Sequence, residues 1–214
     1  DVADYVSRVW ATGREPVLRR LDSYATPATA YPRGEKVGRA RIVRSVYSGV
    51  YMCYGVRGVD FFETRRLPVT CLAVGRKTWM VDDPPHWWSI EDTAAKLGGR
   101  VLVGGLGLGL IVHALDANPN VERVVVVERE RDVIGLIGDR VPRSKVEIVE
   151  TDFEEYLDRA EPFDAAFVDL WVTHGYADTF RTLAEQVVPL ALRVLDKTGA
   201  RMWSLGFSGS EPVL

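Results

Sequence analysis

Closely spaced glycines follow a short apolar run in the middle of the chain. Gly104 and Gly105 come directly after residues 101–103, and Gly107 and Gly109 follow at alternate positions. Glycine lets the backbone turn tightly and approach a ligand without a Cβ in the way. A helix that begins at such a turn offers unpaired N–H groups to a carboxylate or another anion. The spacing predicts a strand, a ligand-binding turn and a helix in succession, with a turn that binds nothing as the alternative.

Three carboxylates follow, each at the end of a predicted strand. Glu128 ends the second strand of this half of the chain, Asp152 follows the third, and Asp169 follows the fourth. A carboxylate at a strand end can accept two hydrogen bonds from a ribose diol, the role expected of Glu128. Asp152 could accept from an adenine amino group while Phe153 packs on the ring. Since open α/β sheets bind ligands at these strand ends, the residues together predict one adenosyl site.

Composition narrows the class of protein. The formal net charge is -3 over 214 residues, which argues against a large nucleic-acid surface. No apolar run is long enough to cross a bilayer, so no membrane partner is expected. Cys53 and Cys71 lie in apolar surroundings and indicate a reducing, cytoplasmic compartment, with one disulfide as the alternative. The three histidines and two cysteines show no zinc spacing, so no metal is expected.

The pattern of elements changes near residues 98–99. Before this point we expect a helical segment at 2–21 with a break near Gly13, and short β-rich runs predict a small antiparallel meander. After it, alternating strands and helices predict a parallel sheet with right-handed crossovers. We expect a helical and β-meander region at 1–97, and a Rossmann-like, doubly wound, mostly parallel α/β domain at 98–214. The expected strands are 41–47, 50–54, 69–74, 78–81, 101–103, 124–127, 145–149, 165–168 and 201–207, and the later helices are 108–118, 132–139, 153–159 and 177–195, the last bent at Pro189.

These features resemble a class I S-adenosylmethionine-dependent methyltransferase over residues 98–207. Gly105, Gly107 and Gly109 match its first motif. The ribose-binding acid, the adenine-binding acid and the fourth-strand position are matched by Glu128, Asp152 and Asp169. Within that superfamily the chain most resembles the spermidine synthase-like branch. There too a small β-rich region ends in a hairpin, an acidic connector and a helix, as at residues 78–90 here.

The chain also departs from the aminopropyltransferase pattern. Those enzymes usually carry D-x-x-D after the fourth strand, and here Val172 stands at the second acid. Their Y-H-E signature is missing, and residues 87–89 read Trp-Trp-Ser instead. The chain stops seven residues after the last expected strand, so the family's last antiparallel hairpin is expected to be missing or very short.

The resemblance implies an S-adenosylmethionine-dependent methyltransferase acting on a small or medium acceptor. One alternative is an aminopropyltransferase that uses decarboxylated S-adenosylmethionine and a diamine, with Asp82 or Asp83 as the second acid. The other alternative is an adenosyl-ligand-binding protein without catalysis. An open sheet edge or the β-rich region could support a homodimer.

Three residues are candidates for catalysis. Asp169 is the expected base or acceptor-orienting residue, because its strand end faces the sulfonium. Asp83 and His86 lie on the connector that should cover the crevice. Among the other residues, His113 is expected to be structural, and His174, Trp87, Trp88 and Trp171 are nearest the predicted acceptor, although packing would also explain one of the two neighbouring tryptophans.

Overall fold

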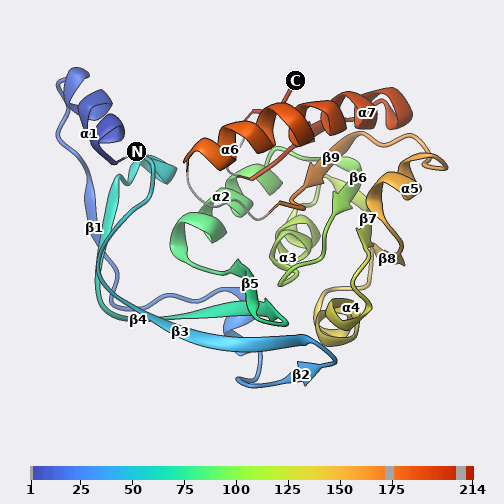
Figure 1. Cartoon of the computed structure of the whole chain (residues 1–214), viewed down its shortest axis with the longest axis horizontal. Coiled ribbons are helices and arrows are strands. Elements are labelled where there is room, and N and C mark those ends of the chain that lie inside the picture. The colour runs from blue at the N-terminus through green and yellow to red at the C-terminus, as the bar shows by residue number, and fades with distance from the viewer. Residues whose placement is uncertain (1, 172–175, 206–210) are drawn as a thin grey trace.

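Two sheets with helices around them make up the molecule (Figure 1). The computed structural model describes residues 2–171, 176–205 and 211–214. The N-terminal strands form a long curved sheet, and the C-terminal strands form a parallel sheet between helices. The α/β class with a separate β-rich N-terminal part is therefore confirmed.

The N-terminal sheet is built around one long hairpin. Its strands are β1 (Leu18–Arg20), β2 (Lys36–Val37), β3 (Ala40–Met52), β4 (Phe61–Val74) and β5 (Lys77–Val81). They lie in the order β1-β4-β3-β2, and β5 pairs with β4. Gly49, with φ of 119°, sits at a β-bulge where the β3–β4 register shifts. The two strands expected at 41–47 and 50–54 are therefore one bulged strand.

The helical segment expected at residues 2–21 breaks near Gly13 as predicted, but its continuation beyond that break is wrong. Helix α1 (Val2–Ala11) ends early, and β1 then pairs in parallel with β4. The carboxylate of Asp60 fixes this segment, because it accepts two hydrogen bonds from the Arg14 guanidinium at 2.7 Å and one from the Val17 N–H at 2.8 Å. A long-range carboxylate therefore overrides the local helical pattern.

The C-terminal sheet is parallel throughout. Its strands are β6 (Gly99–Gly104), β7 (Val121–Glu128), β8 (Val146–Glu150), β9 (Ala165–Val168) and β10 (Arg201–Trp203). The strands lie in the order β10-β9-β6-β7-β8. From β6 the chain adds β7 and β8 on one side and then β9 and β10 on the other, so the order of addition changes side between β6 and β9. Ligands bind at this point in such sheets. Among the described residues the last strand ends at Trp203, and residues 206–207 of the expected strand lie outside them. The Val213 N–H donates to the Met202 carbonyl at 2.7 Å, so a short return segment lies beside β10.

Helices cover both faces of the parallel sheet. On one face lie α2 (Pro84–Ala94), α3 (Leu110–Ala117) and α4 (Arg131–Ile137), and on the other α5 (Phe153–Leu157), α6 (Tyr176–Thr182) and α7 (Val188–Thr198). A π-helical turn at Leu183–Val187 joins α6 and α7 just before Pro189. The expected bend at Pro189 thus takes the form of a widened turn, as proline cannot donate an N–H to the helix. Within the described residues, no helix has both the length and the apolar character needed to cross a bilayer.

The apolar core is shared between the two sheets. Ile42 and Leu72 of the N-terminal sheet pack in one cluster with Leu106 and Leu108 of the glycine turn. A smaller cluster holds Cys53, Phe62 and Trp88 between the hairpin and α2. Cys53 and Cys71 are both free and buried.

Candidate functional site

The glycine turn has the conformation that its sequence predicts. Gly105, Gly107 and Gly109 have φ of 91°, 52° and 72°, values that other residues rarely adopt. A Cβ on Gly104 would lie 2.9 Å from the Phe153 ring, and one on Gly105 would lie 3.0 Å from the Asp169 carbonyl oxygen. The turn therefore needs glycine both for its conformation and for close packing against the neighbouring strand ends.

The carboxylate of Glu128 fastens this turn to the end of β7. Glu128 is 7% exposed. Its Oε2 accepts the Leu106 N–H at 2.9 Å, and its Oε1 accepts the Glu130 N–H at 2.8 Å. Each carboxylate oxygen can accept a second hydrogen bond. Glu128 also lines the cavity described below, so it can hold the turn and still accept from a ligand.

Asp152 stands at the next strand end and caps a helix. Its Oδ1 accepts the Glu154 N–H at 2.9 Å, at the start of α5. Its Oδ2 lies 3.6 Å from a guanidinium nitrogen of Arg129, the residue after β7. The Phe153 ring is buried and lies against Gly104. The structure thus brings Asp152 and Phe153 to the same cavity wall as Glu128.

Asp169 completes the group of acids. It follows β9, and its N–H donates to the Gly104 carbonyl at 3.1 Å, beside the glycine turn. Burial raises the pKa of its carboxyl group, and the nearby His86 ring opposes that shift. An aspartate that costs free energy to ionise, at the end of a strand and against a cavity, is a candidate functional group.

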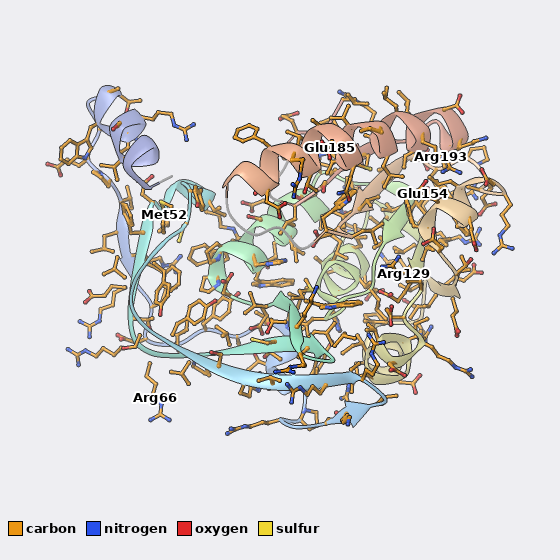
Figure 2. All side chains as sticks on the ribbon, in the orientation of Figure 1. Met52, Arg66, Arg129, Glu154, Glu185 and Arg193 are labelled. Atoms are coloured by element: carbon orange, nitrogen blue, oxygen red, sulfur yellow. The ribbon has the colours of Figure 1, made fainter. Side chains whose placement is uncertain are left out.

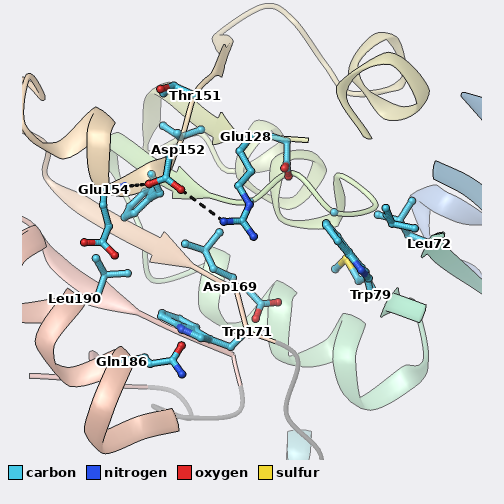
Figure 3. Close-up of a pocket in the computed structure, with 18 of the residues that line it drawn as sticks. Leu72, Trp79, Glu128, Thr151, Asp152, Glu154, Asp169, Trp171, Gln186 and Leu190 are labelled. Atoms are coloured by element: carbon cyan, nitrogen blue, oxygen red, sulfur yellow. Dashed lines mark hydrogen bonds and ion pairs between the residues drawn. The ribbon is translucent and has the colours of Figure 1, made fainter. Parts of the chain in front are cut away.

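One cavity of about 960 Å³ is lined by most of these residues, namely Gly105, Gly107, Glu128, Asp152, Phe153 and Asp169. Gly104 and Gly109, also predicted as binding residues, do not line it. The volume lies near the upper end of the roughly 300–1,000 Å³ of ligand pockets. Figure 3 shows Asp152, Glu154 and Leu190 on one side and Trp79 with Leu72 on the other. The second side comes from the N-terminal sheet and consists of Arg39, Leu72, Val74, Lys77, Trp79 and Met80.

Met80 covers the glycine turn. Its Sδ accepts the Leu108 N–H at 3.2 Å, and a Cβ on Gly107 would lie 2.5 Å from that sulfur. Sequence reasoning did not place Met80 or Trp79 at the site. The signal was present, because both residues belong to the hairpin and connector at residues 78–90 on which the resemblance to the spermidine synthase-like branch was based.

The α6–α7 helix supplies a third part of the wall that the sequence did not indicate. Glu185 and Gln186 lie on the π-helical turn and line the cavity. Arg193, one helical segment later, donates to Glu154 at 2.5 Å and to Asp158 at 2.8 Å (Figure 2). These ion pairs hold α7 against α5 at the edge of the cavity.

The connector acids do not line the cavity. Asp82 is 1% exposed, and its carboxylate accepts from the Thr26 hydroxyl and the Thr70 N–H, both at 2.5 Å. Asp83 caps α2, accepting the His86 N–H at 3.2 Å. In the structure both acids hold β5 and α2 in place.

His86 is half-buried, and its Nε2 is buried with no hydrogen-bond partner among the described residues. The ring favours the charged forms of Asp83 and Asp169, but it does not line the cavity. Burial raises the pKa of Asp83, whose Oδ2 also accepts the Tyr47 hydroxyl at 3.1 Å.

Of the remaining aromatic and histidine candidates that the structure describes, one lines the cavity and the others pack elsewhere. Trp171 lines the cavity, whereas Trp88 is buried in the core beside the Arg19 guanidinium. Trp87 packs against the core clusters. His113 is half-buried near the Tyr31 hydroxyl at 3.4 Å, and burial lowers its pKa. Val172 and His174 lie outside the described residues.

Comparison with known proteins finds likeness in fold. No family model matches the chain, and no curated protein sequence matches it. A candidate S-adenosylmethionine-dependent methyltransferase from Streptococcus mutans is similar at 12% identity and a TM-score of 0.47, over 64% of this chain and 38% of that one. Another candidate methyltransferase, solved with SAH, gives the same identity and TM-score over 64% and 39%. Spermidine synthase from Thermotoga maritima is similar at 16% identity and a TM-score of 0.46, over 65% and 53%.

This chain therefore spans only about 38–53% of the length of these solved neighbours. Its own features are the parallel order β10-β9-β6-β7-β8, the glycine turn after β6 and acids at the next three strand ends. These features agree with the resemblance to class I S-adenosylmethionine-dependent methyltransferases, and both those enzymes and spermidine synthase are among the proteins similar to it in fold.

Proposed function

We propose that the chain is an S-adenosylmethionine-dependent methyltransferase. The observation that supports this most is the convergence of the glycine turn, Glu128, Asp152 and Asp169 on one cavity. Glu128 would hold the ribose diol and Asp152 the adenine amino group. The donor carries a net positive charge, and a cavity wall with three acids suits it.

The donor carboxylate needs its own partner. The Leu106 N–H is already bonded to Glu128, and the Leu108 N–H points at the Met80 sulfur. A thioether is a weak acceptor, so a carboxylate can displace it. We therefore assign the donor carboxylate to the Leu108 end of the turn, with Met80 moving aside.

The chemistry asks little of the protein beyond alignment. The donor supplies a methyl group on a sulfonium, and transfer is an in-line displacement that depends on position and on exclusion of water. Asp169 would orient the acceptor and take its proton if the acceptor arrives protonated. His86 would act through Asp169, by favouring its charged form.

One observation keeps aminopropyl transfer as a second candidate. A diamine acceptor needs a carboxylate for each ammonium group, or its desolvation is uncompensated. Asp82 and Asp83 are engaged elsewhere, but Glu185 lines the same cavity as Asp169. Glu185 could hold the second ammonium in place of the acid missing from the D-x-x-D pattern.

Donor choice tests the proposal. Calorimetry with S-adenosylmethionine, S-adenosylhomocysteine and decarboxylated S-adenosylmethionine should show binding of the first two and weaker binding of the third, which lacks the carboxylate. Incubation of each donor with putrescine, followed by mass spectrometry, is the companion assay. Methylthioadenosine formed only from the decarboxylated donor would replace the first candidate by the second. Failure of all three ligands to bind would remove both.

A further inference from the structure

Five exposed cations lie at the β2–β3 and β4–β5 turns, beside one end of the cavity. Lys36 pairs in register with Arg41 at the β2–β3 turn. The Gly75 N–H donates to the Arg39 carbonyl at 2.9 Å, which brings the β4–β5 turn, with Arg76 and Lys77, beside it. Arg39 and Lys77 themselves line the cavity. We call these five residues the basic rim.

The basic rim has no carboxylate partners among the described residues. None of its five side chains forms a salt bridge there. The nearby acid Asp132 accepts the backbone N–H of Arg39 at 2.7 Å, and Glu35 pairs with Arg140. Neighbouring cations without partners repel one another and lower stability. A surface that keeps them so close together fits a site for an anion.

Charge is divided along the chain in the same way. Residues 1–81 contain 14 Lys or Arg and 7 Asp or Glu, whereas residues 82–214 contain 13 and 23. The cavity lies at the border between the two parts. The acids that line it all lie away from the N-terminal sheet, where they outnumber the cations Arg129 and Arg193: Glu128, Asp152, Glu154, Asp169 and Glu185. The opposite wall carries the cations Arg39 and Lys77 and no acid. A cationic donor therefore suits one end of the cavity and an anionic acceptor suits the other.

Trp79 adds a flat apolar surface at the cationic end. It is half-buried on β5 and stands across the cavity from Asp152 and Glu154 (Figure 3). Guanidinium and ammonium groups bind phosphate, and an indole ring stacks on nucleobases of any sequence. Phosphate and a planar ring next to each other are the chemistry of a nucleotide.

We propose that the acceptor is a nucleotide, free or within a single-stranded nucleic acid, with its phosphate on the basic rim and its base against Trp79. This rests on the proposed methyltransferase function. In the transfer, a lone pair on a base nitrogen forms the new N–C bond while the S–C bond breaks. The bonding pair of the S–C bond stays on sulfur, and the nitrogen's proton passes to the Asp169 carboxylate or to water.

The test measures anion binding apart from catalysis. Fluorescence anisotropy would follow a short labelled single-stranded RNA at several salt concentrations, with AMP as the competitor. The variant Arg39→Ala/Lys77→Ala removes two rim cations that face the cavity. The matched control Arg65→Ala/Arg66→Ala removes two exposed cations of β4; Arg66 projects away from the cavity residues (Figure 2).

The rim variant should bind the RNA about tenfold or more weakly, and its log–log salt slope should fall by about 1.4, or about 0.7 for each lost phosphate contact. The control should keep most of the wild-type affinity. If AMP displaces the RNA at concentrations near its own dissociation constant, the acceptor is a free nucleotide. If AMP does not displace the RNA, the acceptor is a nucleotide within a single-stranded nucleic acid. Both results support the proposal.

Two results would overturn it. The first is that neither the RNA nor AMP binds. The second is that the rim variant and the control lose RNA affinity equally, because the RNA would then be attracted to basic surface in general. Calorimetry with S-adenosylhomocysteine on the same samples distinguishes failure of the acceptor assignment from failure of the proposed function. Donor binding without rim-dependent anion binding removes only this inference. A wild-type chain that binds no donor removes the proposed function, and the acceptor assignment with it.

Discussion

Glu128 connects ligand binding to the shape of the glycine turn. Because its two oxygens accept the Leu106 and Glu130 N–H groups, the change Glu128→Gln would turn an amide NH₂ toward a backbone N–H. We expect the free energy of unfolding without ligand to fall by about 1–3 kcal/mol, the cost of a buried unsatisfied group. Donor affinity should fall as well, about tenfold or more, and denaturant unfolding and calorimetry measure the two effects.

The control for this change is Glu122→Gln on the same strand, whose side chain is exposed. It should leave both quantities within about 0.5 kcal/mol of wild type, as surface substitutions usually do. If Glu128→Gln weakened donor binding with no loss of stability, the two backbone contacts would not be what holds the turn.

Asp169 should make stability depend on pH. Burial raises the pKa of its carboxyl group above the ordinary value of about 3.8. The folded state therefore binds the proton more tightly than the unfolded state, and stability is lost as pH rises from about 4 through the raised pKa. Asp169→Asn removes this cost. Its melting temperature should exceed that of wild type by a margin that grows from about pH 4 to neutral pH.

Thermal unfolding at a series of pH values gives that margin, with Asp196→Asn as the comparison, since Asp196 is exposed. A margin that stays constant with pH would show that Asp169 ionises in the folded chain as freely as in water.

At the scale of elements, two glycines of the same turn have different surroundings, so we expect substitutions there to have different effects. Gly107 faces the movable Met80 side chain, whereas a Cβ on Gly109 would lie 2.4 Å from the Val141 Cγ1 inside the core. Both have positive φ, so alanine costs about 1–2 kcal/mol at each. Gly109→Ala should lose about 1–3 kcal/mol more through overpacking. Gly107→Ala should chiefly lose donor affinity.

The double variant Gly107→Ala/Met80→Ala separates strain from crowding. Because it makes room for the new Cβ, it should regain part of the stability that Gly107→Ala loses. Equal losses of stability at Gly107 and Gly109, with no gain from Met80→Ala, would mean that backbone strain alone governs the turn.

The elements themselves show where sequence patterns suffice. The alternation of strands and helices after residue 98 and the glycine turn follow from local pattern, because buried parallel strands and turn glycines are short-range signals. The conformation of residues 14–21 does not follow from local pattern. This segment is held by Asp60, and β1 pairs with β4, both far along the chain. The break expected between strands 41–47 and 50–54 is also absent, because the ladder continues past Gly49 through a bulge.

The candidate site divides in the same manner. The strand ends that carry Glu128, Asp152 and Asp169 are fixed by topology, so the sequence could place them together. The opposite wall depends on how the N-terminal sheet curves over the parallel sheet, and no local pattern shows that curvature. Asp83 was expected there as part of the connector, whereas Trp79 and Met80, just before it, line the wall.

For the whole molecule, the shared core predicts that the two sheets unfold together. Ile42 and Leu72 pack with Leu106 and Leu108 in one cluster, so neither part buries its apolar surface alone. The boundary at residues 97 and 98 should not separate two folding units. Thermal unfolding followed by far-ultraviolet circular dichroism and by tryptophan fluorescence should give one coincident transition.

A matched substitution in each part of the molecule, on β4 and on α3, checks this. Leu72→Ala and Leu115→Ala are both fully buried positions, and each should shift both signals together by about 2–5 kcal/mol in unfolding free energy. Two separated transitions, with only one moved by each variant, would make the N-terminal region an independent domain.

The small net charge of the molecule is an average over two unlike parts. Read alone, the value of -3 argues against nucleic acid. The division into a basic N-terminal part and an acidic C-terminal part shows why that inference is weak here. A net charge describes solubility and long-range repulsion, whereas an acceptor meets only the surface beside the cavity.

The buried position of Asp169 also has a consequence for turnover. Under the proposed reaction the donor arrives with a sulfonium, and the spent product leaves as a neutral thioether. When Asp169 takes the acceptor's proton, its carboxyl group becomes neutral as the sulfur does, so no buried charge is left without a partner. The site must then release that proton before a carboxylate can meet another sulfonium. Because the ionised fraction of Asp169 grows with pH, capture of the next donor should strengthen toward alkaline pH, so release of the reaction's proton would reset the site for each turnover.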